Sequence, residues 1–248
     1  MKVWILGIGM GPAHVTAEVA SALRSADYVV ASEKSSNDSL LALRRTVVDT
    51  YAPSTPIVTV ADPARDRSPG LTEPGYVRAV ADWHAARVQR YADVLRARGG
   101  TAAFLVWGDP ALYDSTIRIV DQVKALDSEL GYELDYDVLP GISAPQLLAA
   151  RHRIVLHEVG RPVHITTGRR LEEAVAAGHD NIVAMLNSQL DLSAVGEWTI
   201  WWGANLGAAG ERLVTGRVSD VVDEIAAARD AARAEAGWVM DIFLVRKP

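Results

Sequence analysis

The sequence predicts an α/β fold with a mostly parallel sheet in its first half. Short apolar runs typical of buried strands alternate with longer helical patterns, as in parallel sheets covered by helices. Glycine-containing turns follow three of these runs, at Gly7, Gly108 and Gly141. Open α/β sheets hold ligands at the carboxyl ends of their strands, where such turns present backbone N–H groups. The 248 residues, 49% of them hydrophobic, suffice for two domains of ordinary size.

Residues 1–126 alternate between strand and helix patterns throughout. Strands are predicted at 3–6, 27–31, 56–60 and 104–106, and helices at 16–23, 40–48, 76–98 and 112–123. The central run, Phe104 to Val106, ends at Gly108-Asp109-Pro110, which is also common turn chemistry. Asp109 is placed to cap the last of these helices and Pro110 to open it.

Residues 127–248 are expected to form a second α/β domain with a mixed sheet. Its first strand ends at Pro140-Gly141, and Ser143 is placed to cap a helix through Ala150. Strands are predicted at 134–139, 163–167, 182–186, 198–202, 211–215 and 238–245, with a long helix at 218–234. The last two strands are candidates for an antiparallel pair. We place the boundary near residue 126 because the segment that follows is acidic and contains glycine.

Composition limits the classes of function. The chain has no cysteine, which excludes disulfides and thiolate chemistry, and its histidines and acids show no metal-binding spacing. A net charge of −6 argues against nonspecific nucleic-acid binding. No apolar run is long enough to cross a bilayer. The short run after Lys2 leads directly into glycines, so we interpret it as a strand rather than an export signal and expect a cytoplasmic protein.

One basic stretch stands out in this acidic chain. Residues 151–170 carry five arginines against a single acid, Glu158. A local basic stretch is typical of a site for a small anionic ligand rather than a polymer. A solvated basic face with internal ion pairs is the alternative interpretation.

The spacing Gly7-x-Gly9-x-Gly11 after the first strand allows a second interpretation. A dinucleotide-binding fingerprint has glycines in similar places, and Glu33 lies about where a ribose-binding acid is expected. However, Pro12 occupies the place of the third glycine of that fingerprint. A nicotinamide-dependent Rossmann oxidoreductase is therefore an alternative, and so are glycines that only permit a tight turn.

Several longer stretches resemble one enzyme family over the whole chain. Taken with the three glycine turns, they are similar to the class III S-adenosylmethionine-dependent methyltransferases, the tetrapyrrole C-methyltransferases of the cobalamin pathway. The match through Trp107-Gly108-Asp109-Pro110-Ala111-Leu112-Tyr113 is the specific one. The other stretches are 62–67, 82–84, 114–116, 149–154 and 163–170.

The resemblance implies a fold, a cofactor and its contacts. The fold would be two α/β domains with a cofactor cleft between them, and the protein would be a homodimer. S-adenosyl-L-methionine would bind in the cleft and leave as S-adenosyl-L-homocysteine. Carried over by motif, the cofactor contacts are Met10, Gly108, Asp109, Leu112, Ser143, Ala144, Met185 and Ala204. Met10 departs from the family, where many relatives have proline, and Ala204 rests on a looser match.

The resemblance also implies a substrate and a reaction. The substrate would be a tetrapyrrole with many carboxylates, which arginine guanidinium groups match well. The reaction would methylate ring carbon C1 and remove an acetyl group as acetate, in aerobic cobalamin biosynthesis. The candidate carboxylate-binding residues are Arg65, Arg67, Arg151, Arg153, Arg169 and Arg170.

Loss of acetate requires an activated water and donors for an oxyanion. The candidates for these roles are Tyr113, Asp62, Asp66 and His164, and the sequence does not choose among them. His164 lies in an alternating strand, which favours a buried structural role over a catalytic one. Another tetrapyrrole C-methyltransferase of this fold and a noncatalytic tetrapyrrole carrier remain as alternatives.

Overall fold

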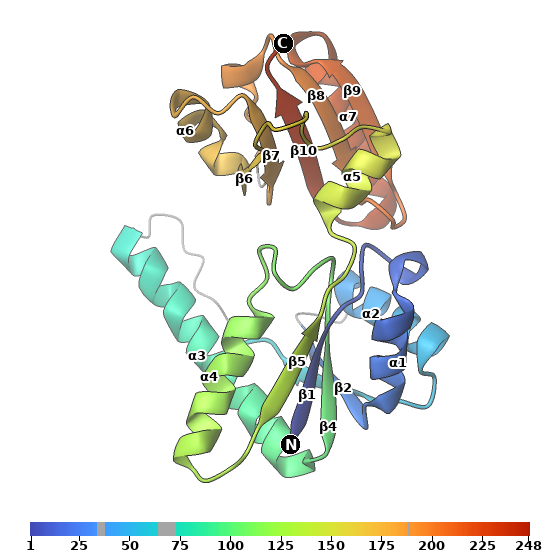
Figure 1. Ribbon diagram of the computed structural model, residues 1–248, viewed down its shortest axis with the longest axis vertical. Coiled ribbons are helices and arrows are strands. Elements are labelled where there is room, and N and C mark those ends of the chain that lie inside the picture. Colours follow the sequence, from blue (N-terminus) through green and yellow to red (C-terminus); the bar gives the residue numbers. More distant parts are fainter. Residues whose placement is uncertain (34–37, 64–72, 188) are drawn as a thin grey trace. The chain divides into compact units, whose positions relative to one another are not determined.

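The structure is a computed structural model that describes residues 1–33, 38–63, 73–187 and 189–248 (Figure 1). The chain divides into two compact units, Met1–Ile142 and Ser143–Pro248, each built on a five-stranded sheet. Among the described helices, none has the length and apolar character needed to span a bilayer.

Unit 1, Met1–Ile142, is a parallel sheet in the order β3-β2-β4-β1-β5. Strand β4 places apolar residues on both faces, with Ala102 and Phe104 on one and Ala103 and Leu105 on the other. Its elements are β1 (Lys2–Gly7), η1 (Pro12–His14), α1 (Ala17–Ser25), β2 (Tyr28–Glu33), α2 (Ser39–Tyr51), β3 (Ile57–Ala61), α3 (Glu73–Arg98), β4 (Thr101–Val106), α4 (Thr116–Glu129) and β5 (Asp135–Leu139).

Both faces of this sheet are buried, as parallel sheets require. On one face, α1 and α2 pack against residues such as Leu6 and Leu105. On the other, α3 and α4 pack against residues such as Ile5 and Phe104. The strand pattern in the sequence therefore predicted the layers correctly, because the inner strands β1, β2 and β4 are apolar on both sides.

The division between the units differs from the boundary expected near residue 126. Strand β5 pairs with β1 along its whole length, from Lys2↔Asp135 to Leu6↔Leu139. Leu134 belongs to the core beneath α3 and α4. The acidic, glycine-containing segment is thus the end of α4 and a turn into β5, and not a linker between domains.

Unit 2, Ser143–Pro248, is a mixed sheet in the order β6-β7-β10-β8-β9. Only β6 and β7 are parallel neighbours, and the remaining pairs are antiparallel. Its elements are α5 (Ala144–His152), β6 (His164–Thr167), η2 (Gly168–Arg170), α6 (Leu171–Ala176), β7 (Asn181–Met185), η3 (Ser193–Val195), β8 (Thr199–Ala204), β9 (Arg212–Arg217), α7 (Val218–Ala236) and β10 (Asp241–Arg246).

The last two strands do not form the antiparallel pair that the sequence suggested. Both β9 and β10 pair antiparallel with β8, which lies between them, so the two run in the same direction. Helix α7 carries the chain from one to the other, and a helical crossover is the usual connection between strands of like direction. Among the fully buried side chains of the core beneath α6 and α7, Trp202 and Phe243 are the largest.

Candidate functional site

The three glycine turns that the sequence singled out meet at one point of unit 1. Gly9 and Gly108 exchange two backbone hydrogen bonds, of 3.2 and 2.8 Å. A Cβ atom added to Gly141 would lie 2.2 Å from the carbonyl oxygen of Gly108 and 2.7 Å from that of Gly7. No side chain fits between these turns, so the predicted convergence at the carboxyl ends of β1, β4 and β5 is confirmed.

Asp109 joins the second turn to the third. Its Oδ1 accepts a hydrogen bond from the Ala111 N–H at 2.8 Å, and its Oδ2 accepts one from the Gly141 N–H at 3.0 Å. Because the carboxylate holds the loop together, the expectation that it caps a helix starting at Pro110 is wrong. Helix α4 begins only at Thr116, whose N–H donates to Asp114.

The backbone of Tyr113 explains why the helix starts late. Its φ of 51° lies in the left-handed region, which an α-helix cannot include. The side chain is 45% exposed at the end of the Gly108 loop. A residue with a strained backbone is typical of functional positions, so Tyr113 stays the candidate catalytic residue with the best local support.

The remaining expected cofactor contacts of unit 1 lie beside this loop. The buried Met10 has its Sδ 3.5 Å from the position a Gly108 Cβ would take. Gly108 itself has a φ of 75°, which strains any other residue. Leu112 donates its N–H to the Asp109 carbonyl at 3.2 Å. Met10, Gly108, Asp109 and Leu112 are therefore brought together by the fold.

The expected contacts of unit 2 lie at strand and helix ends. Ser143 caps α5, and both its N–H and its hydroxyl donate to Gln146 Oε1 at 2.8 Å, next to Ala144. Met185 and Ala204 end β7 and β8, which run in the same direction because each is antiparallel to β10. The last two residues therefore share one edge of their sheet.

A left-handed residue follows each of these two strands. Asn205, with φ 49°, is held by hydrogen bonds to Met240 and Trp238. Leu186, with φ 56°, exposes 53% of an apolar residue. No sequence pattern indicated Leu186, since leucine rarely adopts this conformation. It adds an apolar side chain to the edge that Met185 and Ala204 occupy.

A buried ionic network fixes the turn after Leu186. Arg229 donates from Nη2 to the Asn187 carbonyl at 2.8 Å and from Nε to Asp241 Oδ2 at 3.0 Å. Trp202 Nε1 donates to the same carboxylate oxygen at 3.2 Å. Burial raises the pKa of Asp241, while the Arg229 charge lowers it. The network connects α7 to the carboxyl edge of the sheet and was not visible in the sequence.

The other candidate catalytic residues are less favourably placed. Asp62 directly follows β3, and its Oδ1 lies 3.1 Å from Arg87 Nε in a largely buried ion pair. His164 begins β6, at the opposite edge of its sheet from Met185. Its ring stacks on His179 at 3.9 Å, and burial, followed by the His179 charge, lowers its pKa. Asp66 lies outside the described residues.

The expected carboxylate-binding arginines do not form one group. Arg151 Nε is 2.8 Å from Glu211, and Arg170 Nη2 is 2.7 Å from Glu173, so both have carboxylate partners already. Arg153 ends α5 in a left-handed conformation with φ 57°. Arg65 and Arg67 lie outside the described residues.

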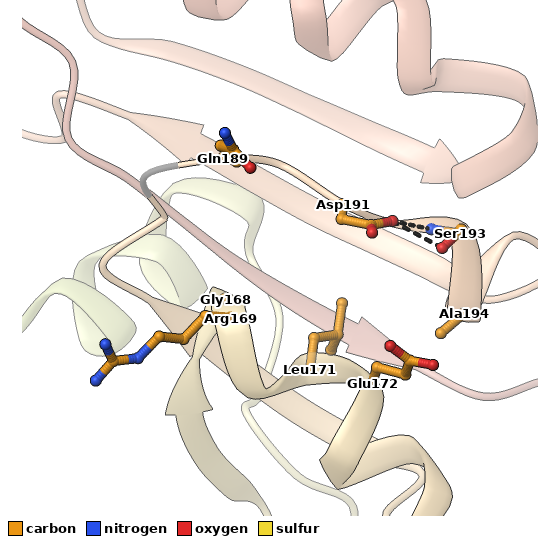
Figure 2. Close-up of a pocket in the computed structure, with 8 residues that line it drawn as sticks. All are labelled: Gly168, Arg169, Leu171, Glu172, Gln189, Asp191, Ser193 and Ala194. Carbon is orange, nitrogen blue, oxygen red and sulfur yellow. Dashed lines mark hydrogen bonds between the residues drawn. The ribbon is translucent and has the colours of Figure 1, made fainter. Parts of the chain in front are cut away.

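Arg169, like Arg153, has no ion pair in the described part of the chain. It lines a cavity of about 220 Å³ together with Leu171, Glu172 and Asp191, among others. Figure 2 shows its side chain extending away from the two acids, while Asp191 is bound to Ser193. Arg169 thus remains available to an anion.

The topology of unit 1 argues against the dinucleotide interpretation. In a Rossmann sheet the strand that carries the ribose-binding acid neighbours the first strand. Here β4 lies between β1 and β2, so Glu33 is displaced by one more strand from the Gly7 turn, or roughly 5 Å. The glycines instead serve the backbone contacts described above.

Comparisons with known proteins agree with this architecture. Residues 2–222 match the family model of the Tetrapyrrole (Corrin/Porphyrin) Methylases. The chain is 44% identical over 255 residues to a precorrin-6A synthase [deacetylating] of Sinorhizobium sp., covering 99% of this chain and 95% of that protein.

Two solved structures are similar in fold. One is that of a putative cobalamin synthesis related protein, CobF, from Corynebacterium diphtheriae, with 38% identity, a TM-score of 0.84 and coverage of 100% and 99% of the two chains. The other is a uroporphyrin-III C-methyltransferase from Thermus thermophilus complexed with S-adenosylhomocysteine, with 16% identity, a TM-score of 0.58 and coverage of 99% and 92%. The match to the family model and the 44% identity show that this chain belongs to the tetrapyrrole (corrin/porphyrin) methylases.

Proposed function

We propose that the protein uses S-adenosyl-L-methionine to methylate ring carbon C1 of precorrin-5 and releases the acetyl group as acetate, giving precorrin-6A. The observation that carries this proposal is the 44% identity, across nearly the whole of both chains, with a precorrin-6A synthase [deacetylating]. The similarity to CobF over both full chains supports the same assignment. The family membership makes the protein a methylase.

The residues at the glycine turns suit the cofactor. Gly7, Gly108 and Gly141 pack backbone against backbone, so peptide groups rather than side chains face any ligand at this point. Backbone groups can hold the amino-acid end of the cofactor without a dedicated charged side chain. In unit 1, Leu112 offers apolar surface for the adenosine beside the buried Met10.

The two halves of the reaction make different demands on the protein. When bound, the cofactor supplies an electrophilic methyl group, and the rigid turns contribute by aligning it with the carbon nucleophile. Water must add to the acetyl carbonyl, so that the carbon–carbon bond breaks and its electron pair returns to the macrocycle. We assign proton exchange in this step to Tyr113, and its exposure at the end of the Gly108 loop supports that role. Asp62 is already paired with Arg87, so we assign it a role in holding Arg87 rather than in proton exchange.

Mass spectrometry of the macrocycle tests the proposal directly. The protein is incubated with enzymatically prepared precorrin-5 and S-adenosylmethionine carrying an isotopic label in its methyl group. We expect a tetrapyrrole that has gained the labelled methyl and lost the acetyl group, with an equal amount of free acetate. A labelled product that keeps its acetyl group would point to another C-methyltransferase of this fold. Absence of labelled product with precorrin-5 would contradict the proposal.

We further propose that the protein acts as a cytoplasmic homodimer. The family resemblance supports the dimer. Light scattering coupled to gel filtration measures the first, and fractionation of the native host measures the second. A monomeric mass under conditions that support turnover would contradict the dimer.

A further inference from the structure

The sheet of unit 1 opens between β2 and β4 at its carboxyl edge. The two strands pair only over Tyr28–Val30 and Ala102–Phe104. Beyond that point β2 continues along β3 to Glu33, and β4 continues along β1 to Val106. The Val106 carbonyl points towards β1, because it accepts the Ile8 N–H at 2.9 Å. The preceding carbonyl therefore points into the opening.

Arg44, from α2, fills this opening. Its Nε donates to the Leu105 carbonyl at 2.8 Å, which satisfies the group that β2 leaves unpaired. Arginine carries further N–H groups on its two terminal nitrogens, arranged as a planar fork. In the described part of the chain, no hydrogen bond or ion pair to those terminal nitrogens is found. The main-chain bond fixes the plane of the fork and leaves its outer edge available.

The charges around Arg44 do not neutralise it. Burial lowers the pKa of its guanidinium, and the Arg87 charge acts in the same direction, while Asp38, Tyr91 and Asp114 act against them. Neither acid forms an ion pair with Arg44 within the described residues. Asp38 caps α2 through its bonds to Leu40 and Leu41 N–H, and Asp114 accepts the N–H of Thr116.

Arg87, in contrast, is already engaged. It pairs with Asp62 at 3.1 Å, donates from Nη2 to the Tyr91 hydroxyl at 2.9 Å and stacks over the Trp83 ring at 4.7 Å. Its position explains part of the electrostatic environment, because it adds positive potential beside Arg44 without binding the same groups. A second positive charge nearby favours an anion in the opening.

We propose that Arg44 binds a carboxylate, supplied by the macrocyclic substrate, at the carboxyl edge of the unit 1 sheet. A fork with two free terminal nitrogens matches a carboxylate in a bidentate arrangement. The site directly adjoins the Gly108 loop. Arg44 donates a hydrogen bond to the Leu105 carbonyl before that loop, and the charge of Asp114 at its far end acts on the pKa of Arg44. The inference rests on the proposed function for the identity of the carboxylate's owner.

The same chemistry has a second possible source, the amino-acid carboxylate of the cofactor. S-Adenosylhomocysteine carries that carboxylate, whereas methylthioadenosine has the same adenosine and thioether without it. The polycarboxylate porphyrin uroporphyrin represents the macrocycle. Measuring affinity for these three probes therefore identifies the carboxylate that Arg44 binds.

The test compares Arg44→Gln and Arg44→Lys with Arg45→Gln. Arg45 is the next residue of α2, it is exposed, and no ion pair to it is found in the described chain, so it matches the charge change without the geometry. Dissociation constants are measured by fluorescence quenching for uroporphyrin and by calorimetry for the two nucleosides. Each variant is titrated well below its own melting temperature.

We expect both Arg44 variants to bind uroporphyrin about 10- to 100-fold more weakly than the wild type, as expected for loss of a charge-assisted bidentate contact. Arg45→Gln and the affinities for both nucleosides should change by less than about threefold. Weaker binding of S-adenosylhomocysteine, with methylthioadenosine unchanged, would keep the carboxylate site but assign it to the cofactor.

Wild-type affinity of both Arg44 variants for all three probes would overturn the inference, and a lowered melting temperature alone would then show that Arg44 only supports the Leu105 carbonyl. This outcome is distinct from failure of the proposed function. If the proposed function failed, the wild type would not methylate precorrin-5, whereas comparing the affinities of the two nucleosides would still show whether Arg44 binds a carboxylate.

Discussion

Replacing Gly141 with alanine tests whether the site depends on contact between backbones. The new Cβ would lie 2.2 Å from the Gly108 carbonyl oxygen, where 3.4 Å is the shortest ordinary contact. The two turns must therefore separate by about 1.2 Å, which strains the 2.8 and 3.2 Å hydrogen bonds between Gly9 and Gly108.

We expect Gly141→Ala to cost about 2–4 kcal/mol of unfolding free energy. Overpacking contributes roughly 1–3 kcal/mol, and each weakened hydrogen bond adds up to about 1 kcal/mol. For a chain of this size the melting temperature should fall by roughly 4–16 °C. Affinity for S-adenosylhomocysteine should fall at least about tenfold, because a displacement near 1 Å misplaces the ligand-binding turn.

Gly196→Ala is the matched control. A Cβ at Gly196 meets nothing within 4 Å, and the backbone there is compatible with alanine. Its effect should lie between zero and a gain of about 1 kcal/mol, because alanine restricts the unfolded chain. Calorimetric melting and titration measure both variants. If Gly141→Ala melted and bound like Gly196→Ala, the contact-based reasoning would be refuted.

Three further predictions concern side chains. Arg229→Met should lower the free energy of unfolding, measured in urea, by about 3–5 kcal/mol, because it leaves the Asp241 carboxylate buried without its cation. A loss no larger than that typical of an exposed ion pair would contradict the network. Burial, followed by the His179 charge, holds the pKa of His164 below its ordinary 6.5, so the folded protein resists protonation of this ring. The stability that neutral His164 contributes to the folded state is complete above pH 6.5 and is lost as the pH falls through the lowered folded pKa. NMR titration should show the His164 pKa rising in His179→Ala. Tyr113→Phe should leave S-adenosylhomocysteine affinity within about twofold yet slow acetate release by about 10²-fold or more; unchanged acetate release in a single-turnover assay would remove this residue from the mechanism.

Sequence patterns located the glycine turns but not the shape of the loop between them. Glycines that follow apolar runs can be predicted to lie close together, because the carboxyl ends of the strands of a parallel sheet share one edge. The loop from Gly108 to Ser115 was misread as the start of a helix. Asp109 has the residue type of a cap, but its carboxylate binds Gly141, a partner far along the chain that no local pattern includes.

Charge counting was a weaker guide than strand geometry. The arginine-rich stretch 151–170 was conspicuous in sequence, yet Arg151 and Arg170 are bonded to nearby acids in the fold. Arg44 was not conspicuous, since it lies in an ordinary amphipathic helix. Its significance arises from the separation of β2 from β4, which depends on tertiary pairing.

The meeting of Gly7 and Gly141 also constrains the order of folding. These residues lie near the two ends of unit 1, so their contact closes nearly the whole chain of that unit. Contacts between positions far apart in the chain form slowly, because the chain loses loop entropy before the contact contributes any stabilisation. A fragment ending at residue 126 would lack β5 and therefore both the contact and an edge of the sheet. During synthesis the turns that we propose for cofactor binding can be completed only after residue 141 has left the ribosome, so cofactor binding would report on the last step in the assembly of this unit.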